Sequence, residues 1–457
     1  MKFVKTSLLT LLASTVALPV LAEEAGNKAG KGWLAREIIG DKLEKEYGIQ
    51  IDGLAQFSVA FGEHASDSND DFSATGNGGP LFFKEDDGFH MDQLHLFVHK
   101  DAKSSVVSRV TPTPAPAPEE IDIGFGFRSV YGSAAYFMTT EGFDDGWSLN
   151  GDSADPYAPN STGEVYRLAI PEMYVDVSTP LLGGTNFMVG SWMSPVGDDI
   201  GFPMDPPNKF YSHPWSFQYT PAKHVGALMS SKLAQNESGI WGAEFGVVRG
   251  WNNMDDKNGD FSYIANLRWR SNDMRTWIDL ESIHGNEEES DNSILSNNPG
   301  PLRVKSTDGA MRHLYVLDAS HAINDKYTVR AAGIYGTQEA GNITSDPGAA
   351  AGHLITKDSK WYGLTGELSY QYSPQTTWNF RAEWLNDDND GDAAKFNAQA
   401  GDYYGLTANA NYKMNDFVQL RPEVRWDKFN SSVDNVNYFP NNENDQFSFM
   451  FDAVFNF

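Results

Sequence analysis

The final segment of the chain, Asp445–Phe457, alternates regularly between two kinds of side chain. Phe or Ala occupies every second position from Phe447 onward, and mostly polar residues occupy the positions between them. Successive side chains of a β-strand point to opposite faces, so we expect a strand with one apolar and one mostly polar face. A strand that ends on an aromatic residue at the carboxylate is typical of bacterial outer-membrane β-barrels, in which one face meets lipid and the other meets water.

The start of the chain predicts export. A basic start, Met1–Lys5, leads into an apolar stretch, and small residues precede Glu23. This pattern predicts a secretory signal peptide at residues 1–22, cleaved after Ala22. A transmembrane anchor is the alternative, but the stretch is short and contains Pro19.

Charge and cysteine content narrow the possible partners. Removal of Lys2 and Lys5, with no acidic residue, takes the formal net charge of −28 to −30. Such a chain is a poor partner for nucleic acid, whose phosphates are bound by clustered Lys and Arg. The absence of cysteine excludes disulfides and thiolate metal sites. No further apolar run is long enough for a helical span, so a membrane crossing requires a closed barrel.

The rest of the chain predicts an all-β, closed antiparallel barrel. Period-2 alternation separated by turn residues gives sixteen candidate strands, namely 49–62, 91–101, 121–136, 166–178, 185–196, 223–234, 239–251, 260–271, 274–284, 312–323, 327–338, 360–373, 376–386, 402–414, 416–428 and 445–457. Short periplasmic turns and long extracellular loops are expected to alternate between them.

The first periplasmic turn is the exception to this alternation, because it contains a long Pro-rich segment, residues 110–118. The proline spacing suits a polyproline II arm. Such an arm could contact peptidoglycan or a partner, but we favour a stiff surface loop.

The mature chain divides into two parts. Residues 23–47 form a periplasmic segment, in which apolar residues at helical spacing predict a short amphipathic helix over 32–47. It could enter the barrel or lie at its periplasmic rim. Residues 48–457 form the barrel.

Three segments carry a resemblance to a known family, namely Leu43–Gly53, Ser212–Gly226 and Gly246–Asn252. With them the chain resembles the OmpL-like putative β-barrel porin-2 family of bacterial outer-membrane porins. The resemblance implies a channel-type barrel with no assigned enzyme activity, and it implies little about the solute.

The strand count and the third long loop indicate a channel. About sixteen strands enclose an aqueous pore, whereas eight are filled by side chains. The loop at 197–222 is rich in Pro, aromatic and acidic residues. By the resemblance to general porins, it is expected to fold inward and constrict the pore with Asp198, Asp199 and Asp205. The alternative is a rigid outer lid.

Charged side chains on the polar face of several strands are the candidate pore lining: Arg268, Arg270, Arg330, Arg381, Glu383, Arg421, Glu423 and Arg425. If the acidic loop faces this wall, the opposed charges create a transverse field that sets ion preference. Alternatively, the arginines pair with neighbouring lumen acids such as Glu383 and Glu423 and stabilise the wall.

Metal and catalytic motifs are weak or missing. Asp388 and Asp390 resemble the start of a calcium loop, but Asn397 stands where an EF-hand has Glu. We predict no cofactor and no catalytic residue, and no nucleophile elbow or zinc-binding motif occurs.

The predicted function is a porin in the outer membrane of a Gram-negative cell, which passes ions and small hydrophilic solutes. Its expected partners are outer-membrane lipid, lipopolysaccharide at the acidic rim, and the barrel-assembly machinery through Phe457. A homotrimer is compatible with a sixteen-stranded porin, although the sequence reveals no oligomer face. The alternative is a barrel enzyme or a non-conducting adhesion or anchoring barrel.

Overall fold

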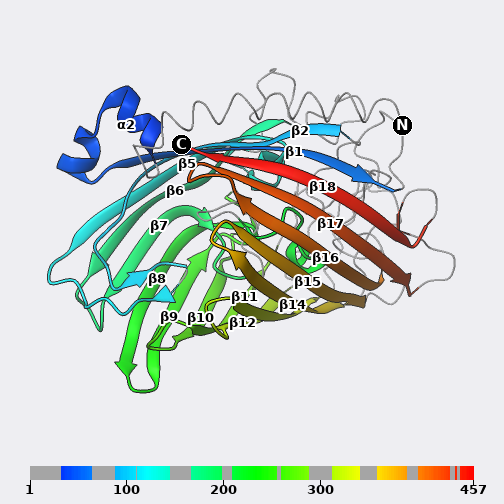
Figure 1. Ribbon diagram of the computed structural model, residues 1–457. Coiled ribbons are helices and arrows are strands. Elements are labelled where there is room, and N and C mark those ends of the chain that lie inside the picture. The colour runs from blue at the N-terminus through cyan, green and yellow to red at the C-terminus, as the bar shows by residue number, and fades with distance from the viewer. Residues whose placement is uncertain are drawn as a thin grey trace.

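A computed structural model describes residues 32–63, 88–109, 111–140, 142–144, 166–197, 208–254, 259–287, 311–339, 358–388, 400–432, 438–439 and 443–457. Sixteen strands form a closed antiparallel barrel (Figure 1). They are β1 (Gln50–Gly62), β2 (Gly88–Lys100), β5 (Asp122–Gly132), β6 (Arg167–Thr179), β7 (Thr185–Met193), β8 (Lys223–Asn236), β9 (Gly239–Val248), β10 (Ser262–Arg270), β11 (Thr276–Asn286), β12 (Met311–Ala322), β13 (Tyr327–Gln338), β14 (Ser359–Ser373), β15 (Thr376–Asp388), β16 (Gly401–Lys413), β17 (Val418–Ser431) and β18 (Asp445–Asn456). The predicted fold class and strand number are confirmed.

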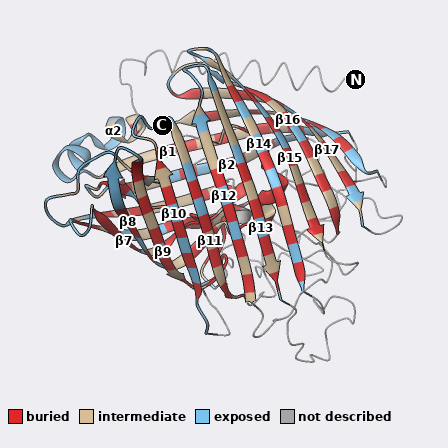
Figure 2. Cartoon of the chain, turned by 90° about the horizontal axis from the view of Figure 1, so that it is seen from below, coloured by how far each residue is buried: buried red, intermediate tan, exposed pale blue. Residues whose placement is uncertain are grey.

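Burial alternates along the strands, as the sequence alternation predicts (Figure 2). In β18, Phe447 and Phe449 are 59% and 45% exposed, whereas Ser448 is 4% and Asp452 0% exposed. The apolar face therefore points outward and the polar face points into the lumen. An outward apolar surface is what a strand needs to face lipid.

The connections separate two ends of the barrel. The links at 180–184, 237–238, 271–275, 323–326, 374–375 and 414–417 are short, and longer links alternate with them. We call the end of the barrel with the short links the short-turn end, and the opposite end the long-loop end. The link between β2 and β5 lies at the short-turn end but is long, and it holds a two-stranded sheet of β3 (Val106–Val107) and β4 (Thr111–Pro112).

Two predicted elements are shorter than expected. The candidate strand 121–136 ends at Gly132, because the chain turns into a 3₁₀-helix, η2 (Ala134–Met138). The predicted helix 32–47 is divided into α2 (Trp33–Ile39) and a π-helical turn, η1 (Leu43–Tyr47). Gly40, between them, has a φ of 79°, which glycine adopts without strain.

The N-terminal helix lies at the rim of the short-turn end. In Figure 1 α2 lies beside the carboxyl terminus. The Trp33 ring packs against Phe417, and its Nε1 donates to the carbonyl of Asn456 at 3.4 Å. Among the described residues, no helix is both long and apolar enough to cross a bilayer.

The barrel closes between its first and last strands. β1 pairs with β18 from Leu54–Asn456 to Gly62–Ser448. Beyond this ladder, Gly53 N donates to the Phe457 carbonyl at 2.8 Å, and Phe457 N donates to the Gly53 carbonyl at 2.9 Å. A Cβ placed on Gly53 would lie 1.9 Å from Cε2 of the Phe457 ring. Only glycine leaves room for the terminal ring here.

Gly53→Val is therefore expected to displace the Phe457 ring and weaken closure. Overpacking of this kind costs about 1–3 kcal/mol. The measurement is the temperature at which the folded, fast-migrating band disappears on a denaturing gel. Gly366→Val is the control, since only a backbone oxygen at 4.0 Å approaches a Cβ there. Equal unfolding temperatures for the two variants would contradict the close packing of Phe457.

Candidate functional site: the barrel lumen

The described part of the third long loop lies inside the barrel. Residues 208–222 contain a 3₁₀-helix, η3 (Trp215–Tyr219), whose Trp215 and Tyr219 are fully buried. Its backbone bonds to lumen-facing side chains of distant strands. Tyr211 N donates to Glu423 Oε2 at 2.8 Å, and Ser212 N donates to Glu423 Oε1 at 3.0 Å. The loop is therefore bound to the inner wall.

Arginines of the same wall hold the loop carbonyls. Arg381 donates to the Ser212 carbonyl at 2.9 Å, and Arg425 donates to the His213 carbonyl at 2.9 Å. Arg421 bonds to the carbonyl of Asn208. Trp215 N donates to the carboxylate of Glu383. These four wall residues and Glu423, all predicted pore lining, thus serve to position the loop.

Buried apolar side chains of the wall also pack against the loop. Trp215 and Tyr219 belong to a cluster contributed mostly by β7 to β17, which includes Trp192, Trp361, Tyr403 and Phe429. The Trp215 ring packs against the Tyr403 ring in a tilted arrangement, with ring centroids 4.6 Å apart. Burying these rings favours the in-folded position of the loop by the hydrophobic effect.

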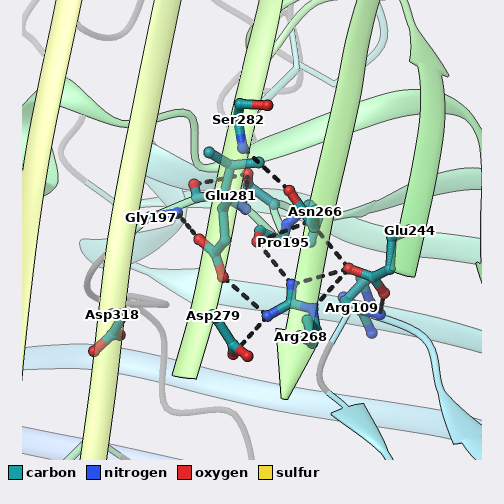
Figure 3. Close-up of polar contacts among 12 residues, drawn as sticks. Arg109, Pro195, Gly197, Glu244, Asn266, Arg268, Asp279, Glu281, Ser282 and Asp318 are labelled. Carbon is teal, nitrogen blue, oxygen red and sulfur yellow. Dashed lines mark hydrogen bonds and ion pairs between the residues drawn. The ribbon is translucent and has the colours of Figure 1, made fainter. Parts of the chain in front are cut away.

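A second buried charge cluster lies on the opposite wall, at Arg268 of β10 (Figure 3). Its guanidinium bonds to Glu244 at 2.9 Å, Asp279 at 2.8 Å and Glu281 at 2.9 Å. Arg270 pairs with Asp279. The cluster also holds the start of the third loop, because Arg268 donates to the Pro195 carbonyl at 3.0 Å and Gly197 N donates to Glu281 at 3.0 Å.

Arg330 of β13 lies between these two walls. It pairs with Asp318 at 2.6 Å and with Glu367 at 3.0 Å. Glu367 also accepts a bond from Lys209 of the third loop at 3.2 Å. The side chains of Arg330 and Lys209 are 15% and 41% exposed. The other predicted arginines, Arg268, Arg270, Arg381, Arg421 and Arg425, are between 0% and 7% exposed.

The first half of the long first turn, up to Pro112, enters the lumen, which corrects our expectation of a surface loop for that part only. Arg109 N donates to Glu244 at 2.6 Å, and Arg109 Nη1 donates to Glu172 of β6 at 2.6 Å. Both acids face inward. Burial opposes the charge on Arg109, but the Glu172 and Glu244 carboxylates outweigh that effect and raise its pKa. Within the Pro-rich segment, Pro112 is buried against the wall, whereas Pro114 and Pro116 are exposed.

The arginines of the wall pair with a neighbouring lumen acid, as the second of our two hypotheses about the wall charges predicts. Arg381 and Arg425 lie 3.3 Å and 2.9 Å from Glu383. Glu423 bonds instead to the loop backbone. Asp198, Asp199 and Asp205, which the transverse-field hypothesis needs, lie outside the described residues, as do residues 1–31 with the predicted signal peptide.

Sequence reasoning missed several charged residues of the lumen. Four of these acids occupy inward-facing positions of their strands and lie beside arginines on neighbouring strands: Glu172, Glu244, Asp279 and Glu281. A prediction of which residues pair across neighbouring strands would have revealed them. Arg109 and Lys209 lie in non-periodic segments, where alternation gives no signal.

The weak calcium candidate is only partly described. Asp388 ends β15 and pairs with Lys360 at 2.8 Å, whereas Asp390 lies outside the described residues. Within the described ranges, no group of three or more His, Asp or Glu residues is arranged to hold a metal ion.

The family of the chain follows from its sequence. The sequence model of the family described as "Putative beta-barrel porin-2, OmpL-like" matches residues 55–457. The chain belongs to this family. As an OmpL-like porin, it is an outer-membrane barrel of the channel-forming class. The match begins within β1 and covers the other fifteen strands completely.

Solved outer-membrane barrels resemble this OmpL-like porin at low identity. The outer membrane channel DcaP of Acinetobacter baumannii is 11% identical, with 90% of this chain and 97% of that chain covered and a TM-score of 0.49. The anion-selective porin from Comamonas acidovorans is 9% identical, with 90% and 99% covered and a TM-score of 0.49. Salmonella typhi OmpF, in complex with daunomycin, is 9% identical, with 90% and 97% covered and a TM-score of 0.49. Likenesses at this level say nothing about the solute. A comparison with curated proteins found no significant match.

Proposed function

We propose that the barrel is a passive channel for ions and small hydrophilic solutes, narrowed by its third loop. The observation that carries this proposal is the seating of residues 208–222 on charged wall residues inside a sixteen-stranded barrel. A barrel of this size has room for an aqueous path beside such a loop. Short turns face the periplasm in outer-membrane barrels, so the long-loop end is the outer mouth.

The proposal is tested by adding purified, folded protein to a planar lipid bilayer in KCl. A channel produces discrete conductance steps, and permeant sugars lower the step size. Absence of conductance steps in many independent bilayers, with folded protein verified on a gel, would contradict the channel. It would favour the alternative of an enzyme or a non-conducting anchoring barrel.

The partly exposed cations Lys209 and Arg330 are proposed to face the permeation path. Replacing both, as Lys209→Gln and Arg330→Gln, removes two positive charges from a narrow region, where charges act on ions at short range. We expect the reversal potential in a KCl gradient to shift toward the value for a purely K⁺-permeable pore. Lys326→Gln, at an exposed position of the short turn between β12 and β13, is the control. An unchanged reversal potential would remove these two residues from the path.

A further inference from the structure

The turn between β2 and β5 reaches far into the barrel from the short-turn end. Glu244, which binds Arg109 N, lies five residues beyond the start of β9 at Gly239, or roughly 16 Å along the strand. The Arg109 guanidinium also approaches the carbonyl of Met193, the last residue of β7, at 3.4 Å. The turn thus extends from the rim to about the middle of the lumen.

Contacts made by residues 105 to 115 hold the turn against the inner wall. The Val106 carbonyl accepts a bond from Asn186 of β7 at 3.1 Å, and the Ala115 carbonyl accepts one from Lys232 of β8 at 2.9 Å. Ser105 Oγ donates to the Gly183 carbonyl at 2.8 Å. These partners face the lumen or its rim, so the turn covers the wall formed by β6 to β10.

The wall is shaped to receive the turn. Gly242 faces inward on β9, and a Cβ built there would lie 2.9 Å from Cγ of Pro112. A real Cβ does not tolerate such a distance, so the ring of Pro112 occupies the space that a larger residue would fill. The absence of a side chain at Gly242 therefore makes room for the Pro112 ring to pack against β9.

One face of the turn remains open. Val106 is 3% exposed, whereas its neighbour Val107 is 50% exposed. Adjacent residues of an extended segment point to opposite sides, so Val106 faces the wall and Val107 faces away from it. Directly across the lumen, the third loop covers β14 to β17. The open face of the turn is therefore directed toward the lumen.

The turn and the third loop meet at one charge cluster. Glu244 accepts bonds from Arg109 N and from Arg268 Nε, and Arg268 also holds the Pro195 carbonyl, where the third loop begins (Figure 3). The two in-folded segments therefore share one buried ionic anchor near mid-barrel.

We propose that the turn at residues 101–121 is a second constriction of the channel, on the periplasmic side, which sets solute size and ion preference together with the third loop. This inference rests on the proposed channel function. Val107 is the residue of the turn that contacts the passing solute. Arg109 is the positioning residue that holds the turn in place.

A single engineered thiol tests this role, because the natural chain has no cysteine. Val107→Cys is modified in the bilayer with a methanethiosulfonate reagent that carries either a trimethylammonium or a sulfonate group. We expect each reagent to lower the single-channel conductance roughly twofold, and the two charges to shift the reversal potential in opposite directions. Mass spectrometry establishes that the thiol has reacted.

The matched control is Gln375→Cys, an exposed position in the short turn between β14 and β15. The same reagents are expected to leave its conductance unchanged. Modified Val107→Cys protein with unaltered conductance and reversal potential would overturn the second constriction. Absence of conductance in the unmodified natural protein would instead overturn the channel proposal itself, so the two failures are distinguishable.

Discussion

Glu423→Ala is expected to release the third loop and to raise the single-channel conductance roughly twofold, with added current noise. Glu423 accepts bonds from Tyr211 N, Ser212 N and the Ser212 hydroxyl, and it is 1% exposed. Each hydrogen bond to a buried charged group contributes about 1.5–3 kcal/mol. Because Glu423 binds two consecutive amides of the loop, alanine removes two backbone anchors of this turn at once.

The control for lost charge is Glu237→Gln, at an exposed position of a short turn. Its conductance should match that of the natural protein. Ser212→Ala, alone and combined with Glu423→Ala, measures the coupling between loop and wall. If Glu423→Ala leaves step size and noise unchanged, the third loop does not depend on this carboxylate for its position.

Arg421→Met is expected to destabilise the folded barrel by about 3–5 kcal/mol, because it leaves a buried carboxylate without its ionic partner. Arg421 Nη2 lies 2.6 Å from Asp452 Oδ2, and Asp452 is 0% exposed. Asp452 also accepts a bond from Gln56 of β1 at 2.7 Å. The pair therefore joins β17, β18 and β1 beside the closing seam. The readout is the unfolding temperature of the folded band on a denaturing gel.

Neutralising Asp452 as well should restore much of the lost stability. In Arg421→Met with Asp452→Asn, the buried charge is gone, although the arginine bonds to the third loop remain absent. Lys360→Met is the surface control, since the Lys360–Asp388 pair is 51% and 36% exposed, and exposed pairs contribute about 0–1 kcal/mol. A double variant no more stable than the single one would show that the pair does not depend on charge compensation.

The alternation of side chains was sufficient to predict most of the fold. Phe447 against Ser448, and Val424 against Arg425, assign one face to lipid and the other to the lumen, because strand geometry links parity to direction. The inward position of all eight predicted wall residues follows from the same rule. The break at Gly40 was not predicted, since helical spacing of apolar residues continues through it.

Parity cannot predict which inward residues meet water. Arg421, Arg425 and Arg330 have the same inward parity, but the first two are buried beneath the third loop, and Arg330 keeps part of its surface exposed. The difference depends on where a non-periodic segment packs, and that position results from bonds between residues some two hundred positions apart in sequence.

The sequence by itself determined the barrel, its strand number and its two faces, because a repeat of two residues and closure in lipid leave few other folds. Only the tertiary structure decided what occupies the lumen. The Pro-rich turn has no periodicity, and its direction is fixed by Arg109 between Glu172 and Glu244 and by the space at Gly242. Those groups come from strands that are neighbours only after the barrel has closed.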